Sequence, residues 1–236
     1  MEKLTIIIPC YNEQDFIGKI IDKVLYAISN IEIENEIIVI DDASTDNSVA
    51  VLQPYIQRNQ VVFHKQEKNQ GKGAAIKAAL TLATGSIILI QDADLEYDPN
   101  DYIKLLRPIL EGYADVVYGS RFIGNGPRRV LFYFHTVGNK LITFLSNLFT
   151  QINLTDIETG YKMFKVDVLK NISIKEKRFG FEIEITAKIS RIKGIRIYEI
   201  GIAYYGRTYK EGKKINWKDG LRAIYCIIKY NLFSRK

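Results

Sequence analysis

The predicted fold is organised around one stretch, Ile87-Ile88-Leu89-Ile90-Gln91-Asp92-Ala93-Asp94-Leu95-Glu96. Its four leading apolar residues follow Gly85-Ser86 and are typical of a strand that is covered on both faces, as in a parallel sheet. Asp92, Asp94 and Glu96 come directly after that strand. Because ligands bind at the carboxyl edge of open α/β sheets, we expect the functional site at this edge.

The three acids predict a metal site. Like charges crowded at one edge repel, and a hard divalent cation with oxygen ligands, Mg²⁺ or Mn²⁺, relieves that repulsion. Such an ion takes further ligands from substrate phosphates, so the metal suggests a phosphorylated substrate. The alternative is a solvated acidic turn ahead of Pro99, which is the commoner outcome for an isolated Asp-x-Asp pattern.

Composition indicates an ordinary globular protein. The chain has 236 residues, of which 47% are hydrophobic and 25% are charged. This suits one α/β domain with a sizeable core. The start at Met1 lacks the pattern of a secretory signal, and no apolar run reaches the length of a membrane span, so we expect a cytoplasmic location. Cys10 and Cys226 are far apart, which favours reduced thiols over a disulfide.

The positive charge lies at the C-terminal end. The formal net charge is +6, and residues 204–236 contain nine Lys or Arg against two acids, which is +7 and leaves −1 for residues 1–203. A basic end of this kind is compatible with nucleic acid, anionic lipid or substrate phosphates, and the sum does not choose among them.

Strand and helix patterns alternate through the first half of the chain. The expected strands are 4–8, 36–40, 61–63 and 87–90, and the expected helices are 13–29, 47–58 and 71–83. This alternation with right-handed crossovers predicts a doubly wound, mostly parallel sheet. Its carboxyl edge would bring Glu13, Asp42 and the acids of 92–96 together as an acidic pocket for a nucleotide and a metal, with Asp42 accepting hydrogen bonds from a base or ribose.

The pattern continues in the second half with helices at 99–110 and 178–192 and strands at 115–118 and 195–202. The strand at 115–118 leads to Arg121. A guanidinium keeps its charge and grips phosphate through a planar fork, so Arg121 is a candidate phosphate ligand. The alternative is a surface ion pair. A basic amphipathic helix over 215–233 ends the chain.

Residues 128–150 predict a helix with one wide apolar face and aromatic residues beside its polar stripe. Outward aromatics together with Arg128 and Arg129 at one end suit a helix that lies in a membrane interface. The alternative is a core helix with a few exposed aromatics. Gly138 is a candidate break that would divide this helix. His135 is a candidate ligand for an acceptor phosphate, although a lone histidine is more often structural.

Five motifs, in order and spacing, resemble the GT-A glycosyltransferases of family 2, and more narrowly the dolichol-phosphate mannose synthases and bacterial polyprenyl-phosphate glycosyltransferases. They are Pro9-x-Tyr-Asn-Glu13, Asp41-Asp42-x-Ser-x-Asp46, Asn69-x-Gly-Lys-Gly73, Asp92-Ala-Asp-Leu95 and Gly119-Ser-Arg121. The resemblance covers nearly the whole chain. It implies one GT-A (Rossmann-like) domain over 1–236, with a nucleotide-sugar-binding half at 1–121 and an acceptor and membrane-interface half at 122–236.

The resemblance also implies a nucleoside-diphosphate sugar donor, GDP-mannose or a UDP-hexose, held with Mg²⁺ or Mn²⁺. The positions that match the base and ribose contacts are Pro9, Tyr11, Glu13, Ile40 and Asp42. Those that match the diphosphate and metal contacts are Asp92, Ala93 and Asp94, with Glu96 where the family often has a Gln ligand. Lys72 would lie near the nucleotide, and Arg207 and Lys213 would clamp the diphosphate from a loop that orders over it.

The acceptor implied by the resemblance is a polyprenyl phosphate, with a sugar hydroxyl on a cell-surface glycan as the alternative. For a hydroxyl acceptor, Asp156 or Glu158 would act as general base, since an alcohol must lose its proton during attack. A phosphate is already ionised, so these acids would then only position groups. Arg128, Arg129 and His135 are the candidate acceptor contacts.

We therefore expect an inverting glycosyltransferase that works on the cytosolic membrane face as a peripheral protein. The expected catalytic residues are Asp94, Arg121, Asp156, Glu158 and Arg207, with electrostatic stabilisation of the leaving group as the main effect. A nucleic-acid-binding protein is a rival, but the acidic pocket would repel a phosphate backbone. A catalytically silent scaffold is a third hypothesis.

Overall fold

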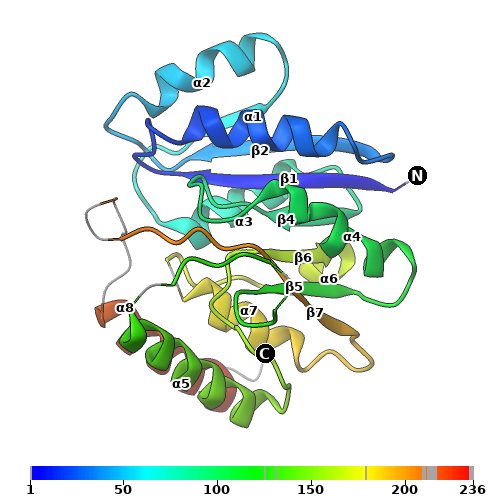
Figure 1. The fold of residues 1–236 in the computed structure, drawn as a ribbon, viewed down its shortest axis with the longest axis vertical. Helices are drawn as coiled ribbons and strands as arrows, with labels where there is room; N and C mark the ends of the chain where they lie inside the picture. The colour runs from blue at the N-terminus through cyan, green and yellow to red at the C-terminus, as the bar shows by residue number, and fades with distance from the viewer. Residues whose placement is uncertain are drawn as a thin grey trace.

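The computed structural model describes residues 2–124, 126–130, 132–178, 180–208, 211 and 217–233. A seven-stranded sheet runs through them in the order β3-β2-β1-β4-β6-β5-β7 (Figure 1). The strands are β1 Lys3–Cys10, β2 Glu34–Asp41, β3 Val62–Lys65, β4 Ile87–Ile90, β5 Val116–Ser120, β6 Lys162–Lys165 and β7 Ile197–Gly201.

The sheet is mostly parallel, as the sequence predicts. β1 pairs in parallel with β2 and β4, β2 pairs in parallel with β3, and β5 pairs in parallel with β7. The central strand β4 is buried along its whole length. This burial explains its unbroken apolar sequence, because a strand covered on both faces has no solvent side to alternate with.

β6 is antiparallel to both β4 and β5, and the sequence predicts no strand there. Its sequence, KMFK, begins and ends with lysine, which gives no strand pattern. Lys162 is nevertheless fully buried, and its ammonium donates to the carbonyl oxygens of Ile157 and Thr159. β6 lies between β4 and β5, so one continuous sheet joins the two halves of the chain.

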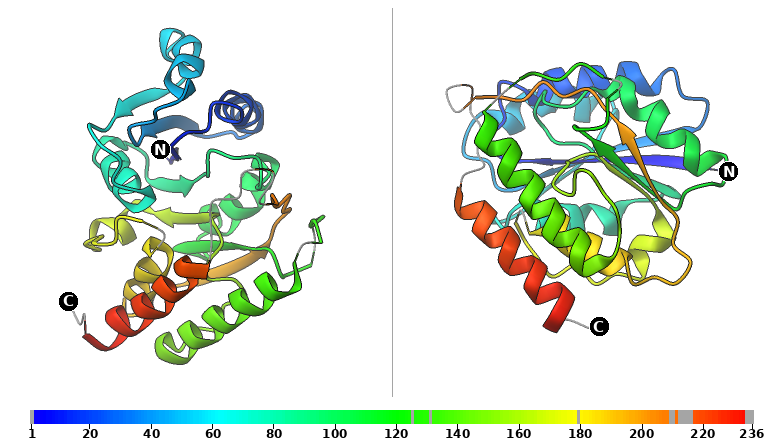
Figure 2. Two further views of the ribbon diagram at one scale, coloured as in Figure 1. Left: turned by 90° about the vertical axis from the view of Figure 1, so that its left-hand side faces the viewer. Right: turned by 60° about the horizontal axis from the view of Figure 1, so that its bottom comes forward.

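Helices cover both faces of the sheet (Figures 1 and 2). The helix α1 Ile17–Ile28, the helix α2 Ser48–Gln57 and the helix α4 Tyr102–Leu110 pack in one core cluster. On the other face lie the helix α3 Lys72–Leu82, the short helix α6 Val166–Lys170 and the helix α7 Phe181–Ile189. A short 3₁₀ turn, η1 Pro99–Asp101, precedes α4.

A second layer of two helices lies outside α7. The helix α5 Tyr133–Thr150 and the helix α8 Trp217–Ile228 run side by side, and both pack on α7 through a separate apolar cluster (Figure 2). The cluster includes Ile142 of α5, Ile183 of α7 and Ile227 of α8. A π-helical turn, η3 Lys229–Phe233, continues α8.

Glu176 anchors α8 to the rest of the molecule. Its carboxylate accepts hydrogen bonds from Arg222 Nη2 at 2.6 Å, Lys229 Nζ at 2.8 Å and the Tyr230 hydroxyl at 2.7 Å. Burial alone would raise the pKa of Glu176, but these three donors together lower it to about 2. The ionised carboxylate therefore holds α8 at neutral pH.

Several predicted helix boundaries differ from the observed ones; the helix expected over 178–192, for example, is observed as Phe181–Ile189. The helix expected over 128–150 begins at Tyr133, because Arg128 forms a β-bridge with Tyr204 and the Arg129 N–H donates to the Tyr204 carbonyl. It runs unbroken through Gly138, so the proposed division is wrong. The helix expected over 13–29 begins at Ile17, and the start expected at 215 for the last helix lies outside the described residues.

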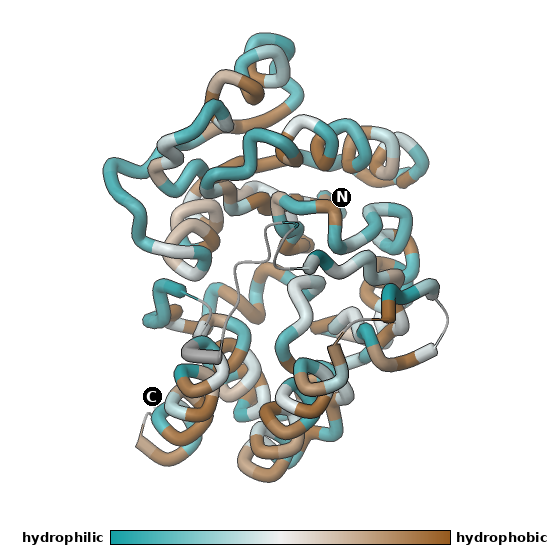
Figure 3. Tube along the Cα trace, turned by 60° about the vertical axis from the view of Figure 1, so that its left-hand side comes forward, coloured by the Kyte–Doolittle hydropathy of each residue, from teal (hydrophilic) through white to brown (hydrophobic). Residues whose placement is uncertain are grey.

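α5 and α8 leave many large apolar side chains uncovered, and hydrophobic residues recur along both helices in Figure 3. The most exposed on α5 are Tyr133, Phe134, Phe144 and Leu148, and those on α8 and η3 are Leu221, Tyr225, Leu232 and Phe233. Among the helices of the described residues, none combines the length and apolar character needed to cross a bilayer.

Candidate functional site

A cavity of about 540 Å³ lies at the carboxyl ends of β1, β2 and β4. It is lined by the loops after these strands, by the first turns of α3, α5 and α7, and by the segment around Tyr204 and Arg207. The sequence predicts a site at this edge of the sheet, and the structure adds the start of α5 as a second wall. Two chemically different surfaces, one acidic and one aromatic, therefore share one cavity.

The base and ribose residues predicted from the sequence come together, with one exception. Pro9, Tyr11, Glu13 and Asp42 line the cavity. Ile40 does not line it, because its side chain is fully buried in the core beneath α3. A contact of the Ile40 side chain with a nucleotide is therefore not available in this structure.

Asp42 holds the loop that precedes α3. Its Oδ1 accepts hydrogen bonds from Gln66 Nε2 at 3.0 Å and from the Gln70 N–H at 2.8 Å, and its Oδ2 accepts from the Gly71 N–H at 2.6 Å. A carboxylate offers about four acceptor positions, so three are already used. Asp42 shapes the wall of the cavity and leaves about one acceptor position for a ligand.

The glycines of the Gly71-Lys72-Gly73 motif are required by close packing. Gly71 has φ +96°, a left-handed conformation that favours glycine, and a Cβ there would lie 2.6 Å from the Lys177 carbonyl oxygen. A Cβ at Gly73 would lie 2.2 Å from the Glu176 carbonyl oxygen. The segment 176–178 therefore packs directly on the start of α3 and fixes the direction in which Lys72 points.

The three acids after β4 each have a different partner. Asp92 Oδ1 lies 2.6 Å from Lys72 Nζ, and Asp94 Oδ2 accepts a 2.6 Å hydrogen bond from Arg207 Nη2. Glu96 accepts from the Tyr204 hydroxyl at 3.0 Å and from the Arg207 N–H at 2.7 Å. Within the described part of the chain, no three acidic, histidine or cysteine side chains are grouped closely enough to hold a metal ion.

The electrostatics of this edge nevertheless fit a divalent cation. Burial, together with the charges of Asp92 and Glu96, raises the pKa of Asp94 to about 7, although Arg207 acts in the opposite direction. A carboxyl group whose pKa is raised so far lies among excess negative charge, and a bound cation would offset that charge. The donors are hard oxygens, as Mg²⁺ and Mn²⁺ prefer. Asp92 and Asp94 fit this role, although Asp94, like Glu96, already accepts a hydrogen bond on each oxygen.

Arg207 lies among the acids that follow β1 and β4. Besides Asp94, its guanidinium nitrogens lie 3.6 Å from Glu13 Oε2 and 3.6 Å from Glu96 Oε1. Its guanidinium carbon lies 5.1 Å from the centre of the Phe16 ring. Arg207 Nε is buried without a hydrogen-bond partner among the described residues. Lys213, the second basic residue expected here, lies outside the described residues.

Lys72 joins the acid after β4 to an acid of α7. Its Nζ lies 2.6 Å from Asp92 Oδ1 and 3.0 Å from Glu182 Oε1. Burial alone would lower the pKa of Lys72, but these two carboxylates raise it above the ordinary lysine value. The sequence gives no role to Glu182, because an acid in the first turn of a helix is common on helix-dipole grounds alone.

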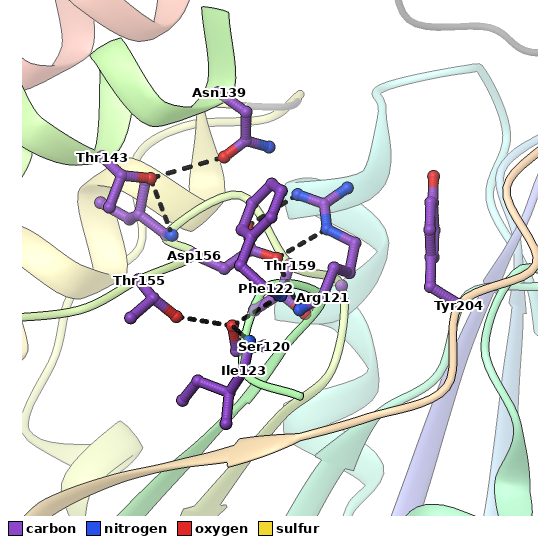
Figure 4. A network of polar contacts seen from close by, with 12 residues as sticks. Ser120, Arg121, Phe122, Ile123, Asn139, Thr143, Thr155, Asp156, Thr159 and Tyr204 are labelled. Atoms are coloured by element: carbon purple, nitrogen blue, oxygen red, sulfur yellow. Dashed lines mark hydrogen bonds and ion pairs between the residues drawn. The ribbon is translucent and has the colours of Figure 1, made fainter. Parts of the chain in front are cut away.

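Arg121 and Asp156 form a buried ion pair (Figure 4). Arg121 donates from Nε to Asp156 Oδ2 at 2.6 Å and from Nη2 to Oδ1 at 2.7 Å. Asp156 is fully buried, and the Arg121 guanidinium carbon lies 5.2 Å from the centre of the Tyr204 ring. Arg121 lines the cavity, and its ion pair with Asp156 holds its guanidinium in place.

Glu158 is the acid that lines the cavity at this point. Burial raises the pKa of Glu158 to about 7; the Arg121 guanidinium lowers it, and the charges of Asp156 and Glu182 raise it. Close by, burial lowers the pKa of Lys162 to about 8. Of the two predicted base candidates, Glu158 is therefore accessible from the cavity, and Asp156 is engaged on both oxygens by Arg121.

The three tentative acceptor residues lie on the wall made by the start of α5. Arg128, Arg129 and His135 all line the cavity, together with Phe132. Arg129 also donates from Nη1 to Glu211 at 2.7 Å and to the Gly206 carbonyl oxygen at 3.1 Å. The two arginines here place positive charge on this wall next to exposed aromatic side chains.

Comparison with known proteins identifies the family. The sequence model described as "Glycosyl transferase family 2" matches residues 5–173. The chain belongs to glycosyltransferase family 2. The residues matched include all the motifs at the carboxyl edge of the sheet except the segment of Arg207. The resemblance inferred from the five motifs is confirmed, and the chain is a transferase.

Two curated members of the family show its relatives. The undecaprenyl-phosphate mannosyltransferase of Micrococcus luteus is 30% identical, with a match over 100% of this chain and 96% of that protein. The dodecaprenyl-phosphate galacturonate synthase of Rhizobium johnstonii is 22% identical over 89% of this chain and 61% of that protein. This glycosyltransferase is therefore similar to enzymes that are named for a polyprenyl phosphate.

A solved structure confirms the fold. The glucosyl-3-phosphoglycerate synthase of Mycobacterium tuberculosis, in complex with Mn²⁺, uridine diphosphate and glucosyl-3-phosphoglycerate, superposes with a TM-score of 0.76. The match covers 98% of this chain and 80% of that chain at 17% identity. The glycosyltransferase thus has the GT-A fold, as predicted. The same enzyme also has a structure with Mn²⁺ and uridine-diphosphate-glucose.

Proposed function

We propose that this glycosyltransferase moves a hexose from a nucleoside-diphosphate sugar to a polyprenyl phosphate at the cytosolic face of a membrane. One observation carries the proposal: a single cavity is lined at one end by Asp92, Asp94 and Arg207, and at the other by Arg128 and Phe132 at the start of α5. The first end suits a metal and a diphosphate. The second suits an anionic group on an apolar chain.

The donor would bind with its base against Pro9 and Tyr11 and its diphosphate near Asp94. GDP-mannose and UDP-hexoses are the candidate donors, and the mannosyltransferase name of the Micrococcus luteus relative supports the first. Asp92 and Asp94 would hold Mg²⁺ or Mn²⁺, and the bound ion would supply positive charge that offsets the negative charge of the leaving group. The metal-bound structures of the Mycobacterium tuberculosis enzyme support a divalent ion.

The reaction is a displacement at the anomeric carbon. An oxygen of the acceptor phosphate attacks that carbon, the bond from the carbon to the diphosphate oxygen breaks, and its electron pair leaves with the nucleoside diphosphate. Attack from the face opposite the leaving group inverts the anomeric centre. Arg207 and Lys72 are the cations of this chain placed to balance the growing charge, and fixed charges in a water-poor site give large electrostatic stabilisation.

The acceptor would enter along α5. Arg121 and Arg128 both line the cavity and would hold the acceptor phosphate, since an arginine fork matches phosphate geometry. The exposed apolar side chains of α5 and α8, with the exposed basic residues Lys140 and Arg222 nearby, suit contact with an anionic membrane surface. A membrane contact there would present the lipid phosphate at the mouth of the cavity.

A hydroxyl acceptor is the second candidate, and Glu158 favours it. A general base works best when its pKa lies near the working pH, and the pKa of Glu158 is about 7. Glu158 would then take the proton of the attacking hydroxyl. With a phosphate acceptor no proton needs to be removed, so replacement of Glu158 distinguishes the two acceptors.

A transfer assay tests the proposal. Purified protein would receive GDP-mannose or UDP-glucose with a radiolabelled sugar, Mn²⁺, and undecaprenyl phosphate in detergent micelles. We expect label in the organic phase with undecaprenyl phosphate and none with undecaprenol, which lacks the phosphate. Glu158→Gln should keep this activity within about a factor of ten, since no base is required. Transfer to glycans alone, with Glu158→Gln inactive, would reject the lipid acceptor.

A further inference from the structure

One buried carboxylate oxygen beside the donor site has no partner. Glu182, in the first turn of α7, is 6% exposed and lines the cavity. Its Oε1 lies 3.0 Å from Lys72 Nζ, but its Oε2 has no hydrogen-bond partner among the described residues. Buried polar atoms are nearly always hydrogen-bonded, and an unsatisfied one in a cavity indicates a missing ligand.

The surroundings of Glu182 restrict what that ligand group is. A carboxylate oxygen is an acceptor, and the nearby Asp92 and Glu158 are acids as well, so a phosphate group is excluded from this position by charge repulsion. Lys72 already supplies a cation beside Glu182. The remaining fitting group is a neutral donor such as a hydroxyl.

The position of Glu182 relative to the diphosphate site identifies the source of the hydroxyl. Lys72 spans from Glu182 to Asp92, so Glu182 lies one side chain beyond the predicted diphosphate contact. In a nucleoside-diphosphate sugar the group next to the diphosphate is the hexose, which carries several hydroxyl groups. The hexose would therefore meet Glu182 when its diphosphate meets Asp92.

We propose that Glu182 Oε2 accepts a hydrogen bond from one hydroxyl of the donor hexose and thereby selects the sugar. This inference rests on the proposed function, because it requires a nucleotide-sugar donor. Lys72 holds Glu182 and Asp92 at fixed positions, so the sugar and the diphosphate are recognised by one connected group of side chains. A site built to hydrogen-bond a hydroxyl discriminates strongly against a donor that lacks it.

Glu182→Gln is the informative substitution. The amide has nearly the shape of the carboxylate, and its oxygen can still accept from Lys72, but it presents an N–H donor where the hydroxyl would donate. Binding of nucleotides and nucleotide sugars would be measured by titration calorimetry with Mn²⁺. We expect affinity for free GDP or UDP within about threefold of wild type, and affinity for the corresponding nucleotide sugar lowered by about tenfold or more.

Deoxygenated donors locate the contact. Donors that lack one hydroxyl at a time would be titrated into wild type and Glu182→Gln. For one hydroxyl we expect a loss of about tenfold or more in wild type and less than about threefold in the variant, because the partner is already gone. Glu36→Gln, which alters a partly buried carboxylate at the far end of the sheet, should behave as wild type throughout.

The outcomes separate this inference from the proposed function. If wild type binds no nucleotide sugar, the proposed function itself fails. If wild type binds one, but Glu182→Gln weakens free nucleotide as much as nucleotide sugar, Glu182 only supports Lys72 and the inference is overturned. Equal losses for every deoxy donor in both proteins would also overturn it.

Discussion

Arg207 donates a 2.6 Å hydrogen bond from Nη2 to Asp94 Oδ2, although 113 residues separate them in the chain. The contact joins the segment after β7 to the acids after β4, and it places a permanent cation on Asp94, whose pKa burial raises to about 7. Arg207 Nε lies 3.6 Å from Glu96 Oε1 but has no hydrogen-bond partner among the described residues, so the guanidinium retains a donor for an anionic ligand. This pairing lets Arg207 connect the segment after β7 to the proposed donor site at the carboxyl end of β4.

Replacing Arg207 should weaken donor binding more than it destabilises the fold. We expect Arg207→Gln to lower affinity for GDP or UDP by about tenfold to a hundredfold, since a charge-assisted hydrogen bond is worth about 1.5–3 kcal/mol. Titration calorimetry with Mn²⁺ would measure this. Arg196→Gln, which removes an exposed pair with Asp115 at the other end of β7, is the matched control and should leave affinity unchanged. Wild-type affinity in Arg207→Gln would remove Arg207 from the donor site.

Breaking the Arg121–Asp156 pair should destabilise the protein. Asp156→Asn leaves the buried guanidinium without its counter-charge, and removing one partner of a buried pair costs about 3–5 kcal/mol. A urea titration followed by circular dichroism would measure the change. Glu111→Gln breaks the exposed Arg107–Glu111 pair and should change stability little. Equal effects of the two substitutions would show that burial of the Arg121 pair contributes nothing.

The attachment of α8 should depend on pH. The pKa of Glu176 falls from 4.5 to about 2 on folding, so its stabilising contribution is present above pH 4.5 and is lost as pH falls toward 2. Hydrogen bonds to a charged group contribute about 1.5–3 kcal/mol, and each kcal/mol shifts the melting temperature by about 2–4 °C for a chain of this size.

Thermal melts of wild type and Glu176→Gln would test this. We expect a lower melting temperature for the variant at pH 7 and a difference that shrinks steadily below pH 4.5. Glu36→Gln removes another carboxylate with a pKa lowered to about 2, but it lies away from α8. Only Glu176→Gln should increase proteolytic cleavage near α8. A Glu176→Gln difference that stays constant down to pH 3 would contradict the role of the ionised carboxylate.

The exposed apolar faces of α5 and α8 should bind membranes. Phe144 and Leu148 are 62% and 63% exposed on α5 and do not line the cavity. Changing both to Ser should lower partition onto anionic vesicles by about tenfold or more, because full burial of such a side chain contributes about 1.5–3 kcal/mol. Co-sedimentation with phosphatidylglycerol vesicles would measure it.

Tyr26→Ser is the control for the membrane test, because Tyr26 is 68% exposed on α1, on the opposite side of the molecule from α5 (Figure 1). The control should bind vesicles as wild type does. Activity of the Phe144/Leu148 double variant in detergent should persist, since neither residue lines the cavity. Equal vesicle binding by wild type and the double variant would reject α5 as the membrane contact.

The sequence predicts the parallel part of the fold because its signals are local. The run Ile87–Ile90 and the acids after it are adjacent in the chain, and the alternation of strands and helices requires a common carboxyl edge. The sequence alone therefore brings Glu13, Asp42 and Asp94, the predicted donor contacts, to one edge of the sheet. Ile40 is the exception, because a motif match does not tell which side of a strand a residue faces.

The remaining features depend on contacts between distant segments. Lys162 gives no sign of a buried strand, because its burial follows from the pairing of β6 with the distant strands β4 and β5. The sequence predicts Asp156 as a base, but its pairing with Arg121 across 35 residues has no sequence pattern. Glu182 carries no sequence signal for the same reason, since only the fold brings it to Lys72.

The most direct test of the donor site is the metal dependence of nucleotide binding. GDP and UDP would be titrated into wild type and Asp94→Asn, each with Mn²⁺ and again with EDTA. We predict one-site binding by wild type that is at least about tenfold tighter with Mn²⁺, and no metal effect in Asp94→Asn. Equal affinity of wild type in Mn²⁺ and EDTA, or no binding of either nucleotide, would contradict a metal-assisted nucleotide-sugar site at the carboxyl edge of the sheet.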